Sequence, residues 1–284
     1  MFSVLNFNRP SESDPQIWQP VIVRLFAPIA MTSTPVAPEA LPIDRVLGVP
    51  IHLHHDYAGW LGDRVRCGLG THVVTLNAEM SMLAGQETRL GETIDRAELT
   101  IPDGAGVVLY LKLKGHAITR APGIEVSETL LASLAGTGKT AFFFGGAPGV
   151  TDKAAARLMR QYPGLDIIGT QHGYVSPEEM PNLLDRLREL QPATILVGLG
   201  VPRQEYWIAE HRSVCPNAVW IGVGGSFDVW AGVKTRAPKW MGDHHLEWLY
   251  RLYCEPWRWR RMLALPKFAI VAVLELAGLR RARS

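Results

Sequence analysis

The chain has 284 residues, 47% of them hydrophobic and 20% charged, which is the composition of a globular protein long enough to bury a sizeable core. Its formal net charge of +2 is too small to indicate nucleic acid as a partner of the whole molecule. Three widely separated cysteines, Cys67, Cys215 and Cys254, have no metal-binding or disulfide-framework spacing, and this sparse usage is typical of a reducing cytoplasm.

Residues 1–44 are predicted to form a flexible extension. The apolar run at 21–30 resembles the core of a signal peptide, but Arg24 and Pro28 interrupt it, and acidic residues precede it where a basic leader is expected. Prolines after residue 34 favour a linker, and Met31 is an alternative start. No segment has the roughly 20 uninterrupted apolar residues that a membrane span needs.

From residue 71, short apolar runs alternate with stretches of helical period. The strands are predicted at 71–76, 98–101, 140–144, 166–169, 193–199 and 218–223, and the helices near 104–114, 124–135, 149–161, 178–190 and 203–213. Several strands are apolar on both faces, as buried parallel strands are. The alternation predicts an α/β fold with a doubly wound, mostly parallel, Rossmann-like sheet over residues 45–239.

Ligands of such a sheet bind beyond the carboxyl ends of its strands, so the residues that follow each strand are the candidates for a site. These loops are rich in glycine, amides and carboxylates: Asn77-Ala-Glu79, Pro102-Asp-Gly-Ala-Gly106, Gly145-Gly-Ala-Pro-Gly149, His172-Gly-Tyr174, Gly200-Val-Pro-Arg-Gln-Glu205 and Gly224-Gly-Ser-Phe-Asp228. Each loop alone has a structural explanation, because glycines close turns and Asp103 can cap a helix. Six together favour a nucleotide or sugar site.

The common cofactor motifs are absent from the sequence. Gly136-Thr-Gly-Lys-Thr140 resembles part of a P-loop, but it lacks the first glycine and precedes a strand instead of following one. No G-x-G-x-x-G fingerprint, D-x-D pair or metal-ligand spacing of histidines is present, so we expect neither a cofactor nor a metal. Without a metal, other groups must neutralise an anionic leaving group.

Several motifs together resemble the WecG/TagA/CpsF family of glycosyltransferases. They are Thr75-Leu-Asn77-Ala-Glu79, Pro102-Asp-Gly-Ala-Gly106, Arg120-Ala-Pro-Gly123, Phe144-Gly-Gly-Ala-Pro148, Gly198-Leu-Gly-Val-Pro-Arg-Gln-Glu205, Arg236-Ala-Pro238, Glu247-Trp-Leu-Tyr-Arg251 and Glu255-Pro256. The resemblance covers roughly residues 45–265. It implies an inverting transfer from a UDP-sugar, of N-acetylmannosamine, its uronic acid or another hexose, to a sugar on undecaprenyl pyrophosphate in cell-surface polysaccharide synthesis.

An inverting transfer needs a base, and Asp103 matches the aspartate proposed as catalytic in the family. Glycines at 104 and 106 allow substrate to approach the backbone there, and an N-cap of the helix from 104 is the alternative role. Thr75 and Asn77 can hydrogen-bond a sugar, and Arg120 and Gln204 match positions that line the family's pocket. We expect Asp228 to bind uracil or ribose. The amides of Gly145 and Gly146, with the next helix N-terminus, are candidates to hold phosphate.

The last segment, residues 240–284, is predicted to be a helical appendage that associates with the membrane. Eight basic against four acidic residues give it a charge of +4, and tryptophans and tyrosines alternate with them. Such a sequence suits a helix on an anionic bilayer, while Pro266, Lys267 and Glu275 make a spanning helix improbable. The resemblance implies that this appendage closes over the site, with Arg251, Arg258 and Arg261 on the pyrophosphate. The alternatives are an ordinary helix with its aromatics in the core and, more weakly, a nucleic-acid patch.

These observations predict a cytoplasmic enzyme bound peripherally to the inner face of the membrane. Its partners would be a UDP-sugar, a lipid-linked acceptor and anionic lipid, without nucleic acid; a homo-oligomer is possible. Two other functions remain open. One is a non-catalytic nucleotide-binding module that recruits partners to the membrane, and the other is a nicotinamide-dependent dehydrogenase, which the missing glycine fingerprint disfavours. The donor sugar is not identified by any motif.

Overall fold

The computed structural model describes residues 37–243 and 246–279, so residues 1–36 of the predicted extension lie outside it. The first described element is an antiparallel hairpin of β1 (Ile43–Val46) and β2 (Val49–His52). Leu47 and Gly48 have positive φ values of 52° and 86°, as a two-residue hairpin turn requires. The sequence analysis did not predict this hairpin, because Leu-Gly lacks the Asn-Gly or Asp-Gly signal of such turns.

The centre of the fold is a six-stranded sheet in the order β4-β3-β8-β7-β5-β6, in which every pair is parallel. Its strands are β3 (Thr71–Leu76), β4 (Leu99–Pro102), β5 (Thr140–Gly145), β6 (Asp166–Gln171), β7 (Thr194–Gly198) and β8 (Val219–Gly222). All six lie within two residues of their predicted bounds. The predicted parallel α/β architecture is therefore confirmed.

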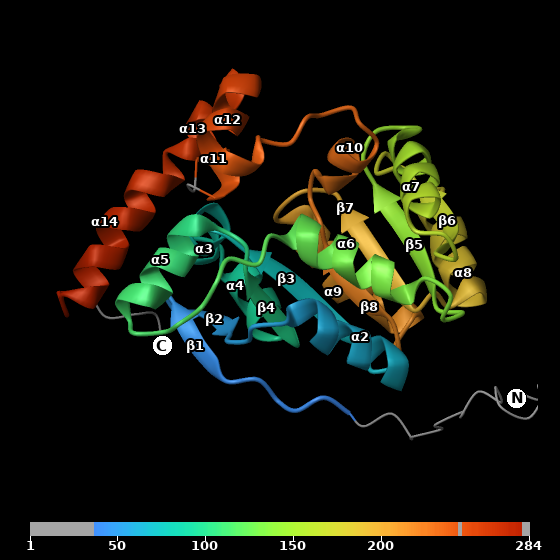
Figure 1. Ribbon diagram of the computed structural model, residues 1–284, viewed down its shortest axis with the longest axis horizontal. Coiled ribbons are helices and arrows are strands. Elements are labelled where there is room, and N and C mark those ends of the chain that lie inside the picture. Colours follow the sequence, from blue (N-terminus) through green and yellow to red (C-terminus); the bar gives the residue numbers. More distant parts are fainter. Residues whose placement is uncertain (1–36, 244–245, 280–284) are drawn as a thin grey trace, which may run out of the picture. The chain divides into compact units, whose positions relative to one another are not determined.

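Helices cover both faces of the sheet (Figure 1). One face packs against α2 (Tyr57–Cys67), α6 (Gly123–Leu134), α7 (Val150–Gln161) and α10 (Ser226–Trp230), and the other against α8 (Met180–Leu190) and α9 (Arg203–His211). Successive side chains of a strand point to opposite faces. Accordingly, Phe143 belongs to the first apolar cluster, whereas Phe142 and Phe144 belong to the second.

Four helices between residues 45 and 239 were not predicted. They are α2, α3 (Ala78–Ala84), α4 (Thr88–Asp95) and α10, whereas α5 (Ala105–Leu113) matches the helix expected near 104–114. For α2 and α3 the caps were an available signal: Asp56 accepts from the amide of Gly59 at the start of α2, and Gly68 ends α2 in the left-handed conformation. Asn77 caps α3 by accepting a hydrogen bond from the Met80 amide.

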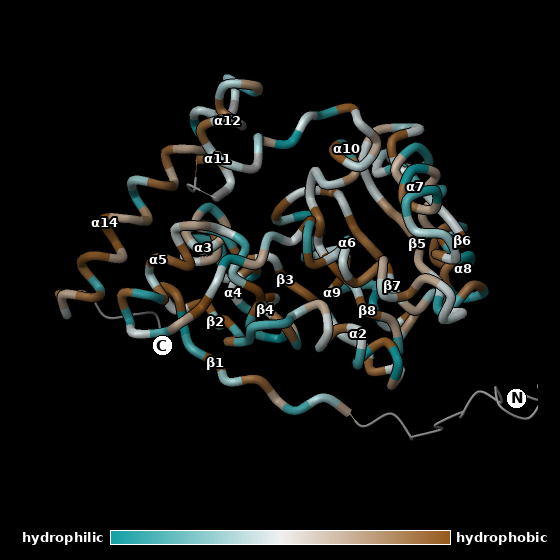
Figure 2. Tube along the Cα trace, viewed as in Figure 1, coloured by the Kyte–Doolittle hydropathy of each residue, from teal (hydrophilic) through white to brown (hydrophobic). Residues whose placement is uncertain are grey.

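The C-terminal segment is helical, as expected, and belongs to the same compact unit as the sheet. It contains α11 (Lys239–Asp243), α12 (Glu247–Cys254), the 3₁₀ turn η2 (Pro256–Arg258), α13 (Trp259–Met262) and α14 (Ala264–Leu276). No helix of the described residues is long and apolar enough to cross a membrane. The predominantly hydrophobic α14 lies against α3 and α5 (Figures 1 and 2).

The aromatic side chains of this segment mostly face solvent. Tyr253 is 83% exposed, Trp257 72% and Trp240 58%, while Phe268 on α14 is buried against the fold. The alternative in which the segment packs its tryptophans and tyrosines into the core is therefore wrong for these three residues. Apolar residues of α14, and not these three aromatic side chains, pack against the fold.

Candidate active site

The loops after β3 and β4 meet at the carboxyl edge of the sheet. The two strands are paired with Thr75 opposite Ile101 and Leu76 opposite Pro102, so their following residues are neighbours. A Cβ at Gly104 would lie only 2.9 Å from the Cβ of Asn77. Glycine at position 104 thus allows the close approach that brings Asn77 and Asp103 together.

An open cavity of about 590 Å³ lies at this junction. Three of the predicted site residues, Asn77, Asp103 and Arg120, line its polar end, together with Glu79 and Glu247. The rest of its wall is mainly apolar and comes from α5 and α14. The volume is typical of ligand sites.

Asp103 is held by the start of α6. Its Oδ1 accepts a hydrogen bond of 2.8 Å from the Gly123 amide, while its own amide donates to the Leu76 carbonyl. Helix α5 has Gly104 as its N-cap and receives no side-chain cap. The predicted N-cap role for the helix from 104 is therefore wrong: Asp103 is oriented by the N-terminus of a different helix, at the wall of the cavity.

Thr75 and Asn77 take part in the fold around the same point. The Thr75 hydroxyl donates to the Gly222 carbonyl at 3.2 Å, and a Cβ at Gly123 would approach Thr75 Cγ2 to 2.6 Å. Thr75 therefore lies directly beneath the segment that orients Asp103. Asn77 lines the cavity while its Oδ1 caps α3, which leaves its side-chain amide nitrogen as the group suited to donate to a sugar.

Arg120 joins the sheet edge to the C-terminal segment. Its Nε donates to the Asp103 carbonyl at 2.7 Å, and its guanidinium makes a 2.5 Å ion pair with Glu247 of α12. Both side chains are largely buried, at 16% and 10% exposure. Sequence reasoning missed Glu247 as a site residue, although it opens the Glu247-Trp-Leu-Tyr-Arg251 motif, because nothing local shows that this motif returns to the β4 loop.

Arg261 of α13 also reaches the polar end. Its Nε donates to Glu79 at 2.6 Å, and Glu79 lines the cavity. Of the three arginines predicted to contact pyrophosphate, this one is placed beside the cavity. The side chains of Arg251 in α12 and Arg258 in η2 lie outside the part of the chain that the structure describes.

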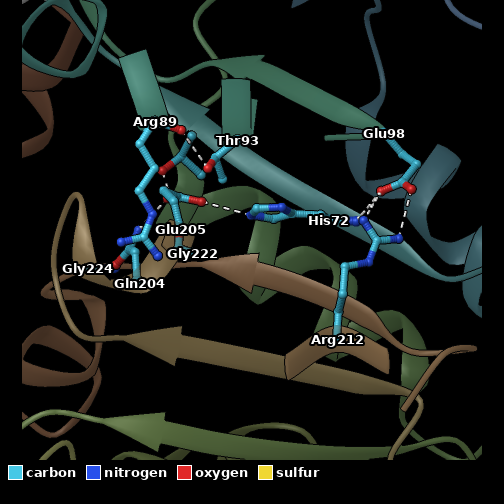
Figure 3. A network of polar contacts seen from close by, with 10 residues as sticks. His72, Arg89, Thr93, Glu98, Gln204, Glu205, Arg212, Gly222 and Gly224 are labelled. Atoms are coloured by element: carbon cyan, nitrogen blue, oxygen red, sulfur yellow. Dashed lines mark hydrogen bonds and ion pairs between the residues drawn. The ribbon is translucent and has the colours of Figure 1, made fainter. Parts of the chain in front are cut away.

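Gln204 belongs to a buried polar network and not to the cavity wall (Figure 3). It is 1% exposed; its Oε1 accepts from the Gly224 amide at 3.0 Å, and its Nε2 donates to Glu205 at 2.9 Å. Glu205, fully buried, also pairs with His72 at 2.9 Å. The prediction that Gln204 lines the pocket is thus not met in this structure, because its Oε1 holds the turn after β8 and its Nε2 is bonded to Glu205 of α9.

Glu98 lies at the far side of this network (Figure 3). It accepts from both terminal nitrogens of Arg212 and from the His72 amide. Although burial would raise its pKa, these hydrogen bonds hold the pKa of Glu98 below its usual 4.5. A carboxylate with a depressed folded-state pKa stabilises the fold above its unfolded pKa and loses that contribution as the pH falls through the folded value.

We therefore expect Glu98→Gln to reduce the free energy of unfolding at pH 7 and to flatten its dependence on pH below about 4.5. Urea unfolding of both proteins between pH 7 and pH 3 measures this, with the exposed Glu189→Gln as a matched control. The two stabilities should converge toward pH 3. A difference that stays constant over the whole range would contradict the role given to Glu98.

Asp228 lies away from the cavity, in the first turn of α10. It pairs with Lys234 at 2.8 Å, and Lys234 also pairs with Glu255 of the C-terminal segment at 2.8 Å. Burial lowers the pKa of Lys234, but the two carboxylates outweigh it and the net pKa is raised. In this structure Asp228 thus helps to anchor the C-terminal segment, a function that its position after two glycines did not reveal.

Gly145 and Gly146 lie at the carboxyl end of β5, three strands from β3, which is about 14 Å at ~4.8 Å per strand. The Gly146 amide donates to the Gly198 carbonyl at 3.1 Å, so that predicted phosphate donor is already used by the fold. The turn nevertheless lies at a point where the order of the strands reverses. The chain leaves β5 toward β6 and leaves β7 toward β8 on the opposite side, which is where nucleotides bind in such sheets.

Among the residues that the structure describes, no three His, Cys, Asp or Glu side chains group closely enough to hold a metal ion. The positive groups at the cavity are arginines. Arg120 is one of its lining residues, and Arg261 adjoins it through Glu79.

Comparison with known proteins agrees with the resemblance seen in the motifs. The model of the glycosyl transferase WecG/TagA/CpsF family matches residues 45–282. An N-acetylglucosaminyldiphosphoundecaprenol N-acetyl-beta-D-mannosaminyltransferase of Bacillus spizizenii is 39% identical over 207 residues, which cover 72% of this chain and 79% of the relative. The protein of the same name from Bacillus subtilis is 34% identical over 208 residues, covering 73% and 80%. The chain therefore belongs to the WecG/TagA/CpsF family and is a glycosyltransferase.

Proposed function

We propose that the protein transfers a hexose or N-acetylhexosamine from a UDP-sugar to a sugar on undecaprenyl pyrophosphate, with inversion at the anomeric carbon. The names of the relatives support the lipid-linked acceptor and an N-acetylmannosamine-type donor. The observation that carries the proposal is the cavity in which Asn77, Asp103 and Arg120 stand at one end of a long apolar wall.

In the proposed reaction Asp103 takes the proton of the acceptor hydroxyl as that oxygen bonds to the anomeric carbon. The bond between this carbon and the pyrophosphate oxygen breaks at the same time, and UDP leaves with the bonding electrons. The hydrogen bond from Gly123 fixes the carboxylate for this transfer. Asn77 positions the sugar, while Thr75, which does not line the cavity, supports the segment that orients Asp103. The nucleotide extends toward the ends of β5 and β7.

The leaving group acquires negative charge, which must be stabilised for the reaction to be fast. We assign this task to Arg120 and Arg261, with Arg251 and Arg258 as further candidates, and to no metal ion. A diphosphate would compete with Glu79 and Glu247 for these guanidinium groups. Donor binding would thus change the ion pairs that join the C-terminal segment to the rest of the fold.

We place the enzyme on the cytoplasmic face of the membrane, where a UDP-sugar and a lipid-linked acceptor meet. The exposed Trp240, Tyr253 and Trp257 of the C-terminal segment, with its arginines, are suited to the interface of an anionic bilayer. The attachment is peripheral.

A screen of UDP-sugars with detergent-dispersed N-acetylglucosaminyl diphosphoundecaprenol tests the proposal, with UDP release as the readout. We expect UDP-N-acetylmannosamine or a related hexose donor to be turned over only when the acceptor is present. EDTA should change the rate less than about twofold. Release of UDP without acceptor, or no turnover of any UDP-sugar, would contradict the transfer, and loss of activity in EDTA would contradict the metal-free mechanism.

A further inference from the structure

Two helices extend from the polar end of the cavity and lie side by side. Helix α5 begins two residues after Asp103, and α14 begins three residues after Arg261. The rings of Tyr110 and Phe268 meet edge to face, with centroids 6.4 Å apart, and the Tyr110 hydroxyl donates to Glu275. These contacts fix α14 against α5 (Figure 1).

Between their contact points the two helices expose apolar side chains to one groove. Leu109 and Leu113 of α5 are 59% and 63% exposed, and Val273 and Leu276 of α14 are 63% and 39% exposed. All four line the cavity that contains Asp103. Exposed large apolar side chains facing each other in one groove mark a binding surface for an apolar ligand.

The polar groups of the cavity are confined to one end. Asn77, Asp103, Arg120 and Glu247 stand there, while the groove that continues along α14 is apolar for most of its length. The 13 residues of α14 span about 20 Å. The matching ligand is therefore an extended hydrocarbon chain with a polar, hydroxyl-bearing head.

We propose that the groove between α5 and α14 binds the head-proximal isoprene units of the acceptor's polyprenyl chain. This inference rests on the proposed function, because it takes the acceptor to be a polyprenyl diphosphate sugar. The diphosphate lies near Arg120 and Arg261, the acceptor sugar reaches Asp103, and the chain runs between the helices. A cavity of about 590 Å³ holds only part of such a chain, so the remainder stays in the bilayer.

A bulky substitution inside the groove tests binding of the polyprenyl chain separately from sugar transfer at Asp103. Ala269 of α14 lines the groove and is exposed, so Ala269→Trp fills it without disturbing packed neighbours. Ile270→Trp is the matched control, because Ile270 is the next residue, is 62% exposed and does not line the groove. Acceptors that carry an undecaprenyl chain or only a methyl group on the same diphosphate sugar are compared in detergent, without a bilayer.

For Ala269→Trp we expect the ratio of the two KM values, undecaprenyl over methyl, to rise about tenfold. That corresponds to the loss of roughly two buried methylene groups. Ile270→Trp should leave the ratio at the wild-type value. An unchanged ratio in Ala269→Trp, or an equal rise in both KM values, would overturn the groove as the chain's site.

A second measurement does not depend on turnover. An undecaprenyl diphosphate with a photoactivatable diazirine near the head of its chain is crosslinked to the full protein, and the labelled peptides are identified by mass spectrometry. We expect labels on 105–113 and 264–276 that Ala269→Trp suppresses. Labelling confined to other surfaces would overturn the proposal. If the wild-type protein is labelled in the groove yet transfers no sugar, the proposed function fails and the lipid site stands.

Discussion

Asp103→Asn is expected to lower the turnover of sugar transfer by about 10²–10⁴, the usual contribution of a positioned general base. Binding of the UDP-sugar should change little. The asparagine Oδ1 can still accept the hydrogen bond from Gly123, so the loop and the start of α6 keep their geometry. Only the ability to accept a proton from the acceptor hydroxyl is removed.

UDP release in the presence of acceptor measures turnover, and calorimetry with the UDP-sugar measures binding. Asp185→Asn is the matched control, since Asp185 lies on the exposed surface of α8 and pairs only with the nearby Arg188 among its described ion pairs. A variant that loses donor binding together with turnover would indicate a binding role for Asp103. A variant that keeps full turnover would exclude Asp103 as the base.

Deleting residues 240–284 is expected to abolish both turnover and binding to anionic vesicles. The deletion removes Glu247 from Arg120, Arg261 from the polar end of the cavity and α14 from its apolar wall. Vesicle flotation and UDP release measure the two losses. Full activity in the truncated protein would contradict the part assigned to the C-terminal segment.

The deletion also exposes the apolar surface against which Phe268 is buried, so the truncated protein could lose activity by unfolding. Point variants are therefore needed to separate an effect on the reaction from an effect on stability. Arg261→Ala should lower turnover about 10²-fold, as expected for loss of one group that stabilises developing charge. Arg260→Ala removes the same charge from the same helix, but its guanidinium lies over the Trp259 ring, whereas that of Arg261 pairs with Glu79 of the cavity wall. It should retain near-normal turnover and equal vesicle binding. An equal loss of turnover in both variants would show that Arg261 contributes only positive charge for membrane binding.

The strands, and the carboxyl edge of the sheet at which the candidate site lies, could be predicted because short stretches of sequence indicate them. Each apolar run ends at a glycine, proline or polar residue, and parallel strands bring those ends to one edge. Asn77 and Asp103, which follow β3 and β4, accordingly line the same cavity. Family resemblance, rather than periodicity, singled out Arg120 and Arg261.

What could not be predicted depends on long-range contacts. Gln204 and Asn77 are both amide residues in segments that follow a strand, yet Gln204 is buried beneath the turn after β8 and Asn77 lines the cavity. No local sequence pattern indicates which of the two side chains is buried. The pairing of Glu247 with Arg120, and of Lys234 with both Asp228 and Glu255, joins residues from separate segments, so it emerges only when the chain is folded.

The most direct test of the site is a crystal structure of the Asp103→Asn variant with its intact UDP-sugar and a short-chain acceptor. The acceptor hydroxyl should lie about 3–3.5 Å from the anomeric carbon, within hydrogen-bond reach of residue 103, and the pyrophosphate should face Arg120 and Arg261. A donor bound in this cavity with its anomeric carbon turned away from residue 103, or bound elsewhere on the protein, would contradict Asp103 as the base of an inverting transfer.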